Sequence, residues 1–322
     1  MGKTSIEWTD ASWNPIVGCT EISPGCANCY AARLAATRLR ETPQYKNLAT
    51  MTLDKGEFEL KERKPRWNGG VRLLLERLEE PLHWRKPRRI FVCDMGDLFH
   101  ESVDVEAIGM VVQTIAKCPQ HTFQILTKRA ARMKEIFSGY TEYTTFFKGK
   151  PLPNVWLGVS VENQHFADER IPLLLSMPAA VRWISAEPLL GPVDMRVWLN
   201  PPPYPIGPGH WPGIDWVVCG GESGANARPM HPDWARSLRD QCKAAGVPFF
   251  FKQWGEWARW EPSLGTDHVQ HMAVDGRTGS SPGWVDGYKN ITITEPIVKA
   301  GKKKAGRLLD GREWNQFPQV AP

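Results

Sequence analysis

The stretch GCTEISPGCANCYA, Gly18 to Ala31, carries three of the seven cysteines of the chain, at positions 19, 26 and 29. It follows a short apolar run, NPIVG (14–18), which predicts a strand. It leads into CYAARLAATRLR (29–40), where the spacing of alanine and leucine predicts a helix. An odd cysteine count without a secretory signal argues against a disulfide framework. The cysteine cluster therefore indicates a metal site or a redox centre.

The spacing of these cysteines, C-x6-C-x2-C, suits a metal group that takes three sulfur ligands and keeps one position open. Structural zinc normally has four ligands, and no second pair of ligands follows here. A [4Fe–4S] cluster fits better, because three cysteines bind three irons and the fourth iron stays free for a small molecule. Pro24 and Gly25 permit the tight loop that such a cluster needs. Three reduced, unliganded thiols are the alternative.

Short apolar runs alternate with helical segments along most of the chain, which is the pattern of βαβ units. After the first strand, the predicted strands cover residues 89–94, 122–127, 155–160, 181–187, 215–221 and 247–252. Amphipathic helices are predicted within 104–118 and 231–246. This number of strand–helix pairs predicts an α/β fold with a partial or near-complete (β/α) barrel, in which polar groups after each strand converge on one face.

The chain is expected to divide near residue 255. Residues 1–255 would form the barrel core with the cysteine loop at 18–31. Residues 256–322 lose the strand–helix rhythm and are rich in glycine, proline and turns. We predict that they form a loop-rich C-terminal appendage, acting as a lid or a substrate-selecting segment.

Composition restricts the environment and the partners. No stretch approaches the roughly 18 to 20 apolar residues of a membrane span, and no apolar leader follows the N-terminus, so we expect a cytoplasmic protein without membrane contact. The net charge of +5 favours a polyanionic partner only mildly. Scattered basic clusters and three tryptophans at 254, 257 and 260 suggest a nucleic acid or nucleotide, with bases stacking on the aromatic rings. Ordinary core packing of those rings is the alternative.

Polar side chains follow nearly every predicted strand, where a barrel would gather them at one mouth. Helix capping and ion pairing across loops are the alternative for each of them. The set consists of Asp94, Asp97, Glu162, Glu187, Glu222, Lys128, Ser160 and Lys252.

Three cysteines after the first strand of such a barrel resemble the radical S-adenosylmethionine superfamily. Over Ser5 to about Pro318 the chain more closely resembles the phage-associated Gp37/Gp68-like family (DUF5131), and distantly the spore photoproduct lyases. The motifs that carry this likeness are IEWTDASWNPIVGCTEISPGCANCYA, FVCDMGDLFHE, ILTKR, GVSVENQ, EPLLGPVD, WVVCGGESG, ARPMHPDWARSLRDQC and FFFKQWGE.

The resemblance implies a function as well as a fold. Cys19, Cys26 and Cys29 would bind a [4Fe–4S] cluster whose open iron takes the amino and carboxylate groups of S-adenosylmethionine. An external electron donor, of the flavodoxin or ferredoxin type, would supply the electron that releases a 5′-deoxyadenosyl radical. The phage setting of the family suggests modification or repair of a nucleobase in DNA, or of a nucleotide.

The resemblance also implies roles for side chains around the cofactor. Asp97 would hold the methionine ammonium group. Ser160 and Glu162 would bind the ribose hydroxyls, and Glu187 would contact methionine or adenine. The aromatic residue of the superfamily usually precedes the last cysteine, whereas here Tyr30 follows Cys29; it would shield the cluster or pack on adenine.

Two further cysteines, Cys93 and Cys219, stand near predicted strand ends. A thiol at the barrel mouth can donate a hydrogen atom to a product radical, so both are candidate catalytic residues. A small buried strand residue is the alternative. The GGES sequence at 220–223 follows the sixth strand instead of the second, so Glu222 is interpreted as a substrate-side or capping residue.

An alternative function of a different kind, binding without catalysis, stays open. Zinc bound by the three cysteines and a histidine, such as His100 or His231, would make the chain a non-catalytic nucleic-acid-associated protein.

Overall fold

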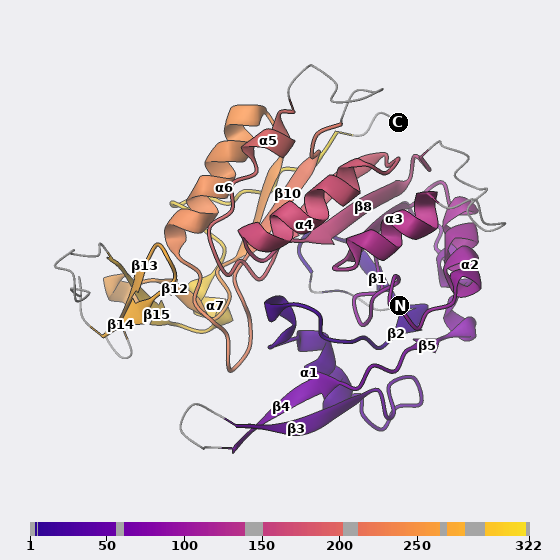
Figure 1. The fold of residues 1–322 in the computed structure, drawn as a ribbon, viewed down its shortest axis with the longest axis horizontal. Coiled ribbons are helices and arrows are strands. Elements are labelled where there is room, and N and C mark those ends of the chain that lie inside the picture. Colours follow the sequence, from indigo (N-terminus) through magenta and orange to yellow (C-terminus); the bar gives the residue numbers. More distant parts are fainter. Residues whose placement is uncertain are drawn as a thin grey trace. The chain divides into compact units, whose positions relative to one another are not determined.

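The computed structural model describes residues 4, 6–55, 61–138, 151–201, 212–264, 269–280 and 294–319. A single seven-stranded sheet is its central element (Figure 1). Hydrogen-bonded neighbours follow the order β1 (Ala11–Trp13), β6 (Arg89–Val92), β7 (Thr122–Thr127), β8 (Val155–Ser160), β9 (Val181–Ala186), β10 (Trp216–Gly220) and β11 (Phe249–Gln253).

The pairs β1–β6, β6–β7, β7–β8 and β10–β11 are parallel. Parallel neighbours need a crossover between them. Between β6 and β11 a helix follows each strand before the next one begins; these are α2 (Val105–Ala116), α3 (Ala130–Ser138), α4 (Gln164–Leu175), α5 (Arg196–Leu199) and α6 (Pro232–Ala245). The predicted α/β class is thereby confirmed as a curled sheet that forms a partial barrel, with β1 and β11 at its two edges.

The first strand of the sheet lies earlier than predicted. β1 covers Ala11–Trp13, whereas β2 (Ile16–Val17) pairs antiparallel with β5 (Arg72–Leu73) outside the main sheet. Pro15 explains the break, because proline has no amide hydrogen to donate to a sheet. Its carbonyl instead accepts a hydrogen bond from the amide of Leu74, at 2.7 Å. The chain thus leaves the sheet before it reaches the first cysteine.

The chain separates into two compact units. One comprises residues 1–160 and 172–183, and the other comprises residues 161–171 and 184–321. The functional division expected near residue 255 stays a prediction. No helix among the residues that the structure describes is long and apolar enough to cross a bilayer.

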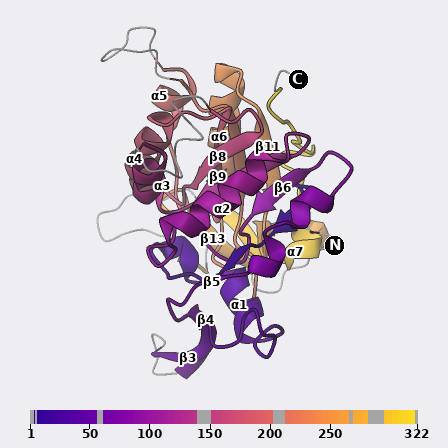
Figure 2. The ribbon, with the colours of Figure 1, turned by 90° about the vertical axis from the view of Figure 1, so that its right-hand side faces the viewer.

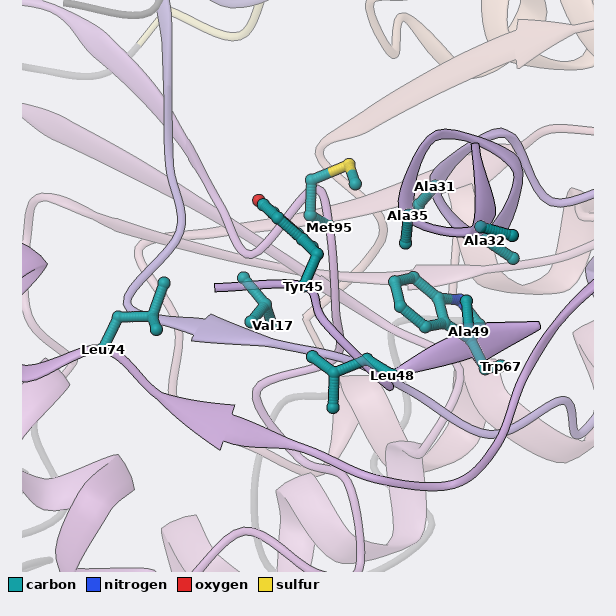
Figure 3. Close-up of a cluster of buried hydrophobic side chains, with 11 residues drawn as sticks. Val17, Ala31, Ala32, Ala35, Tyr45, Leu48, Ala49, Trp67, Leu74 and Met95 are labelled. Atoms are coloured by element: carbon teal, nitrogen blue, oxygen red, sulfur yellow. The ribbon is translucent and has the colours of Figure 1, made fainter. Parts of the chain in front are cut away.

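In the first unit, the cysteine loop leads into α1 (Tyr30–Ala36), which is shorter than the predicted helix. A hairpin that the sequence analysis did not predict, β3 (Ala49–Lys55) with β4 (Lys61–Trp67), packs against α1 (Figures 1 and 2). The alanines of α1 face the ring of Trp67 (Figure 3). This apolar cluster anchors the end of the cysteine loop.

In the second unit, α6 lies against β10 and β11 (Figure 1). It begins after the N-cap residue His231 and ends at Gly246, whose φ of +70° is left-handed. Its buried face includes Trp234, Leu238 and Cys242. The periodicity and the Pro232 and Gly246 end signals therefore gave this helix correctly.

The C-terminal segment is more regular than predicted. An antiparallel sheet has the order β12 (Trp257–Arg259), β15 (Thr294–Lys299), β13 (Val269–Ala273) and β14 (Thr278–Gly279). The tail then returns to the main sheet, where the amide of Phe251 donates to the carbonyl of Trp314 at 2.9 Å. Since an uncovered strand edge invites wrong pairing, one role of the tail is to cover β11. A role as a lid stays a prediction.

Gly18, at the entrance to the cysteine loop, is held in a conformation that suits only glycine. Its φ is +95°, and a Cβ there would overlap the carbonyl oxygen of Gly70. We expect Gly18→Ala to lower the free energy of unfolding by about 3 kcal/mol, from the left-handed backbone and the crowding together. Gly246→Ala is the matched control, because its φ of +70° carries the strain but nothing lies within 4 Å. If urea unfolding showed the same loss of stability in Gly18→Ala and Gly246→Ala, the result would contradict the close approach of the backbone at Gly18.

Candidate metal centre

The three cysteines lie in one loop of the first unit. A short 3-10 turn, η1 (Pro24–Cys26), closes the loop, with the amide of Cys26 donating to the carbonyl of Ser23 at 2.9 Å. The amide of Cys29 then donates to the carbonyl of Cys26 at 3.1 Å, and Cys29 is the N-cap residue of α1. All three thiols are free and half-buried. Local turns of the kind that Pro24 predicted therefore shape the loop that carries the thiols.

The surroundings of Cys19 and Cys29 disfavour bare thiolates. Burial, followed by the charge of Asp97, raises the pKa of Cys19 to about 12, although the charge of Arg129 acts to lower it. Burial also raises the pKa of Cys29, against amide hydrogen bonds from Ala32 and Ala31. Since metal binding displaces thiol protons, such a site holds thiolates only when a cationic metal group replaces those protons.

Among the described residues, no three Cys, His, Asp or Glu side chains converge on the position of a single metal ion. A [4Fe–4S] cluster makes a different demand, because each of its three cysteines binds a different iron. The half-buried thiols, the adjacent guanidinium of Arg129 and the amides at Cys29 match the thiolate ligands and N–H donors that such a cluster takes. The residues present therefore fit a cluster.

Arg129, two residues after the end of β7, is the cation next to the first cysteine. Its side chain is only 3% exposed. Nη1 lies 3.6 Å from the sulfur of Cys19, and Nη2 donates to the carbonyl of Thr20 at 3.3 Å. Nε donates to both carboxylate oxygens of Glu101 at 2.8 Å. Arg129 thus ties the start of the cysteine loop to the segment that follows β6.

Asp97 completes this arrangement. Its Oδ2 accepts from Nη1 of Arg129 at 3.1 Å, and Thr127 Oγ1 donates to its two oxygens at 2.8 and 3.0 Å. The amide of Phe99 donates to Oδ1 at 3.0 Å. Each carboxylate oxygen already has protein partners. This geometry favours Asp97 as a support for Arg129, and its contact with a methionine ammonium group stays a prediction.

His100 has both ring nitrogens engaged. Nδ1 accepts from the amide of Ser102 at 3.1 Å, so Nε2 carries the proton and donates to Thr20 Oγ1 at 2.7 Å. Burial, followed by the charge of Arg129, lowers the pKa of His100 and keeps the ring neutral. Binding zinc would break one of these bonds. The other histidine considered, His231, uses Nδ1 to cap α6 through the amide of Asp233.

Two other predicted residues of the first unit lie near the end of β6. The hydroxyl of Tyr30 donates to the carbonyl of Asp94 at 2.7 Å, and its side chain is exposed. Cys93 is buried and has a φ of +59°, and burial raises the pKa of its thiol. Ser160 is the buried last residue of β8. The first unit therefore contains the three cluster cysteines, Tyr30, Cys93, Asp94, Asp97, Lys128 and Ser160.

The second unit contains the remaining predicted residues. Glu187 accepts hydrogen bonds from Nζ of Lys252 at 2.8 and 2.9 Å, and from Nε2 of Gln253 at 3.2 Å. Glu162 and Arg170 form a fully buried ion pair with a 3.0 Å distance between Oε2 and Nη1. Both carboxylates thus already have partners. Their contacts with ribose, methionine or adenine stay predictions.

The other side chains considered in this unit have structural contacts. The thiol of Cys219 is buried and close enough to that of Cys242 on α6 to interact electrostatically, which favours packing between sheet and helix. Glu222 pairs with Arg228, as its interpretation as a capping residue allows. Trp254 is buried, and its indole donates to the carbonyl of Leu308 at 2.8 Å, so core packing explains this ring.

The sequence analysis did not find Arg129, Thr127, Thr20 or Glu101. It selected Lys128 from the TKR sequence, yet the neighbouring Arg129 is the buried side chain that contacts Cys19, and the buried Thr127 holds Asp97. The alternation of side chains along a strand could not have identified Arg129, because β7 ends at Thr127.

A family model described as a protein of unknown function (DUF5131) matches residues 3–318. No curated protein and no solved structure was found to match the chain.

Proposed function

The chain belongs to the DUF5131 family of proteins of unknown function, and we propose that it is a radical S-adenosylmethionine enzyme. The observation that carries this proposal is the loop of three half-buried thiols, with a buried arginine beside the first of them. The parallel α/β sheet supports it, because the loop lies in the connection between the first two strands of that sheet along the chain, β1 and β6.

The proposal gives a role to each group of residues in the first unit. Cys19, Cys26 and Cys29 would hold a [4Fe–4S] cluster, and the exposed ring of Tyr30 next to Cys29 would shield it. A bound cluster would supply the electron for reductive cleavage of S-adenosylmethionine to methionine and a 5′-deoxyadenosyl radical, and a flavodoxin-like or ferredoxin-like donor would reduce the cluster. Buried groups of the first unit would exclude water, and Cys93 stays a candidate hydrogen-atom donor to a product radical.

We propose a nucleobase in DNA, or a nucleotide, as the substrate. The positive net charge and the scattered basic clusters support a polyanionic substrate. The phage setting implied by the family resemblance points in the same direction.

The test is to reconstitute the full chain with iron and sulfide under anaerobic conditions, then add dithionite and S-adenosylmethionine. We expect 5′-deoxyadenosine to form only when the reconstituted protein, dithionite and S-adenosylmethionine are all present. Omitting dithionite should prevent its formation, since the cluster must be reduced before the cofactor is cleaved. Double-stranded DNA and free nucleotides, added in separate reactions, should differ in how far they raise the rate. A protein that takes up zinc but no iron would contradict the proposal and favour the non-catalytic alternative.

A further inference from the structure

We propose that Arg129 is a positioning residue that makes the cluster easier to reduce, by donating a hydrogen bond to the sulfur of Cys19. This inference rests on the proposed function, because it needs a cluster on the three cysteines. It concerns a buried cation that neither the cysteine spacing nor the family description assigns.

The donors of Arg129 are arranged so that one of them is directed at the sulfur. A guanidinium has five N–H groups in a rigid fork. Nε is held by Glu101 at 2.8 Å and Nη2 by the carbonyl of Thr20 at 3.3 Å. Nη1 has two hydrogens. Nη1 donates to Oδ2 of Asp97 at 3.1 Å and to the sulfur of Cys19 at 3.6 Å. The fixed fork therefore leaves the guanidinium little freedom to turn away from the sulfur.

Burial makes this contact effective. The side chain of Arg129 is 3% exposed, so water screens its charge poorly. Reducing a cluster by one electron makes it more negative, and hydrogen bonds to its sulfur ligands stabilise the more negative state. A cation held next to Cys19 should therefore raise the reduction potential.

Asp97 provides a charge of the opposite sign at the same sulfur. Its carboxylate accepts from the same Nη1 that approaches Cys19, and its side chain is 7% exposed. The negative charge of Asp97 should oppose reduction. Neutralising Arg129 and neutralising Asp97 should thus shift the reduction potential in opposite directions. A loosened loop would not be expected to give shifts of opposite sign in the two variants.

The experiment compares the midpoint potential of the reconstituted full chain, without S-adenosylmethionine, with those of Arg129→Gln, Asp97→Asn and Glu101→Gln. Iron content and the spectrum of the reduced cluster are recorded for each. We expect the equilibrium constant for reduction to fall about tenfold in Arg129→Gln, which for a one-electron couple is a shift of about 60 mV to more negative potential. Asp97→Asn should shift it to more positive potential. Glu101→Gln, with a side chain 62% exposed, should shift it least.

The outcomes separate this inference from the proposed function. Wild-type protein that binds no iron overturns both. Normal iron content with an unchanged potential in Arg129→Gln, or with shifts of the same sign in Arg129→Gln and Asp97→Asn, overturns the inference alone. If Arg129→Gln loses its iron, the test rests on Asp97→Asn. A reduction potential of Asp97→Asn that is equal to or lower than that of the wild type then overturns the inference.

Discussion

Replacing Cys19, Cys26 or Cys29 with alanine is expected to reduce the iron and sulfide of the reconstituted protein to background. Each thiol would bind a different iron, so the two that remain cannot hold the cluster in place of the third. Loss of the cluster should also abolish formation of 5′-deoxyadenosine. Iron and sulfide per chain, measured after removal of unbound metal, are the primary readouts.

The matched controls are Cys118→Ala and Cys242→Ala. Both thiols are fully buried in the same chain, outside the cysteine loop, so their loss should leave iron and sulfide unchanged. Equal iron loss in all five variants would show that folding, and not ligation, limits iron uptake. Full retention in any one of the three loop variants would remove that cysteine from the ligand set.

Glu162→Ala is expected to lower the free energy of unfolding by about 3–5 kcal/mol. Glu162 and Arg170 are 0% and 1% exposed, and the substitution would leave the guanidinium buried without this carboxylate. The guanidinium also lies 4.1 Å from the ring centroid of Phe166, so it is packed in place and cannot easily move into water. Urea unfolding, followed by tryptophan fluorescence, measures the change through a lower midpoint.

Glu169→Ala is the matched control for this prediction. Its carboxylate lies 3.9 Å from Nε of the same arginine, but its side chain is 52% exposed. Exposed ion pairs contribute little, so this variant should stay within about 0.5 kcal/mol of the wild type. Similar losses in the two variants would show that burial of the Glu162–Arg170 pair does not govern its contribution.

The structure reproduces the parts of the fold that depend on short-range patterns. Six of the seven strands of the main sheet lie within one or two residues of the predicted segments, because each is a continuous apolar run between turn residues. Helix α6 begins and ends at its predicted signals, Pro232 and Gly246, for the same reason. The cysteine loop is also a local feature, since turns within eleven residues shape it.

Sequence patterns failed where a residue's role depends on distant partners. After the break at Pro15, β2 pairs with β5, which lies more than fifty residues later, and the hairpin β3–β4 packs on α1 through Ala49 and Trp67.

By itself, therefore, the sequence determined the α/β class, the positions of most strands along the chain and the three thiols of the candidate centre. Only the tertiary structure decided what surrounds them. Arg129 and Cys19 are 110 positions apart, and Arg129 and Asp97 are 32 positions apart, yet these contacts surround the same sulfur. No periodicity spans such separations, because side-chain periodicity reports only which face of one helix or strand is buried. Which charges meet on that face depends on how the strands are paired in the sheet, and the pairing is set by the whole core.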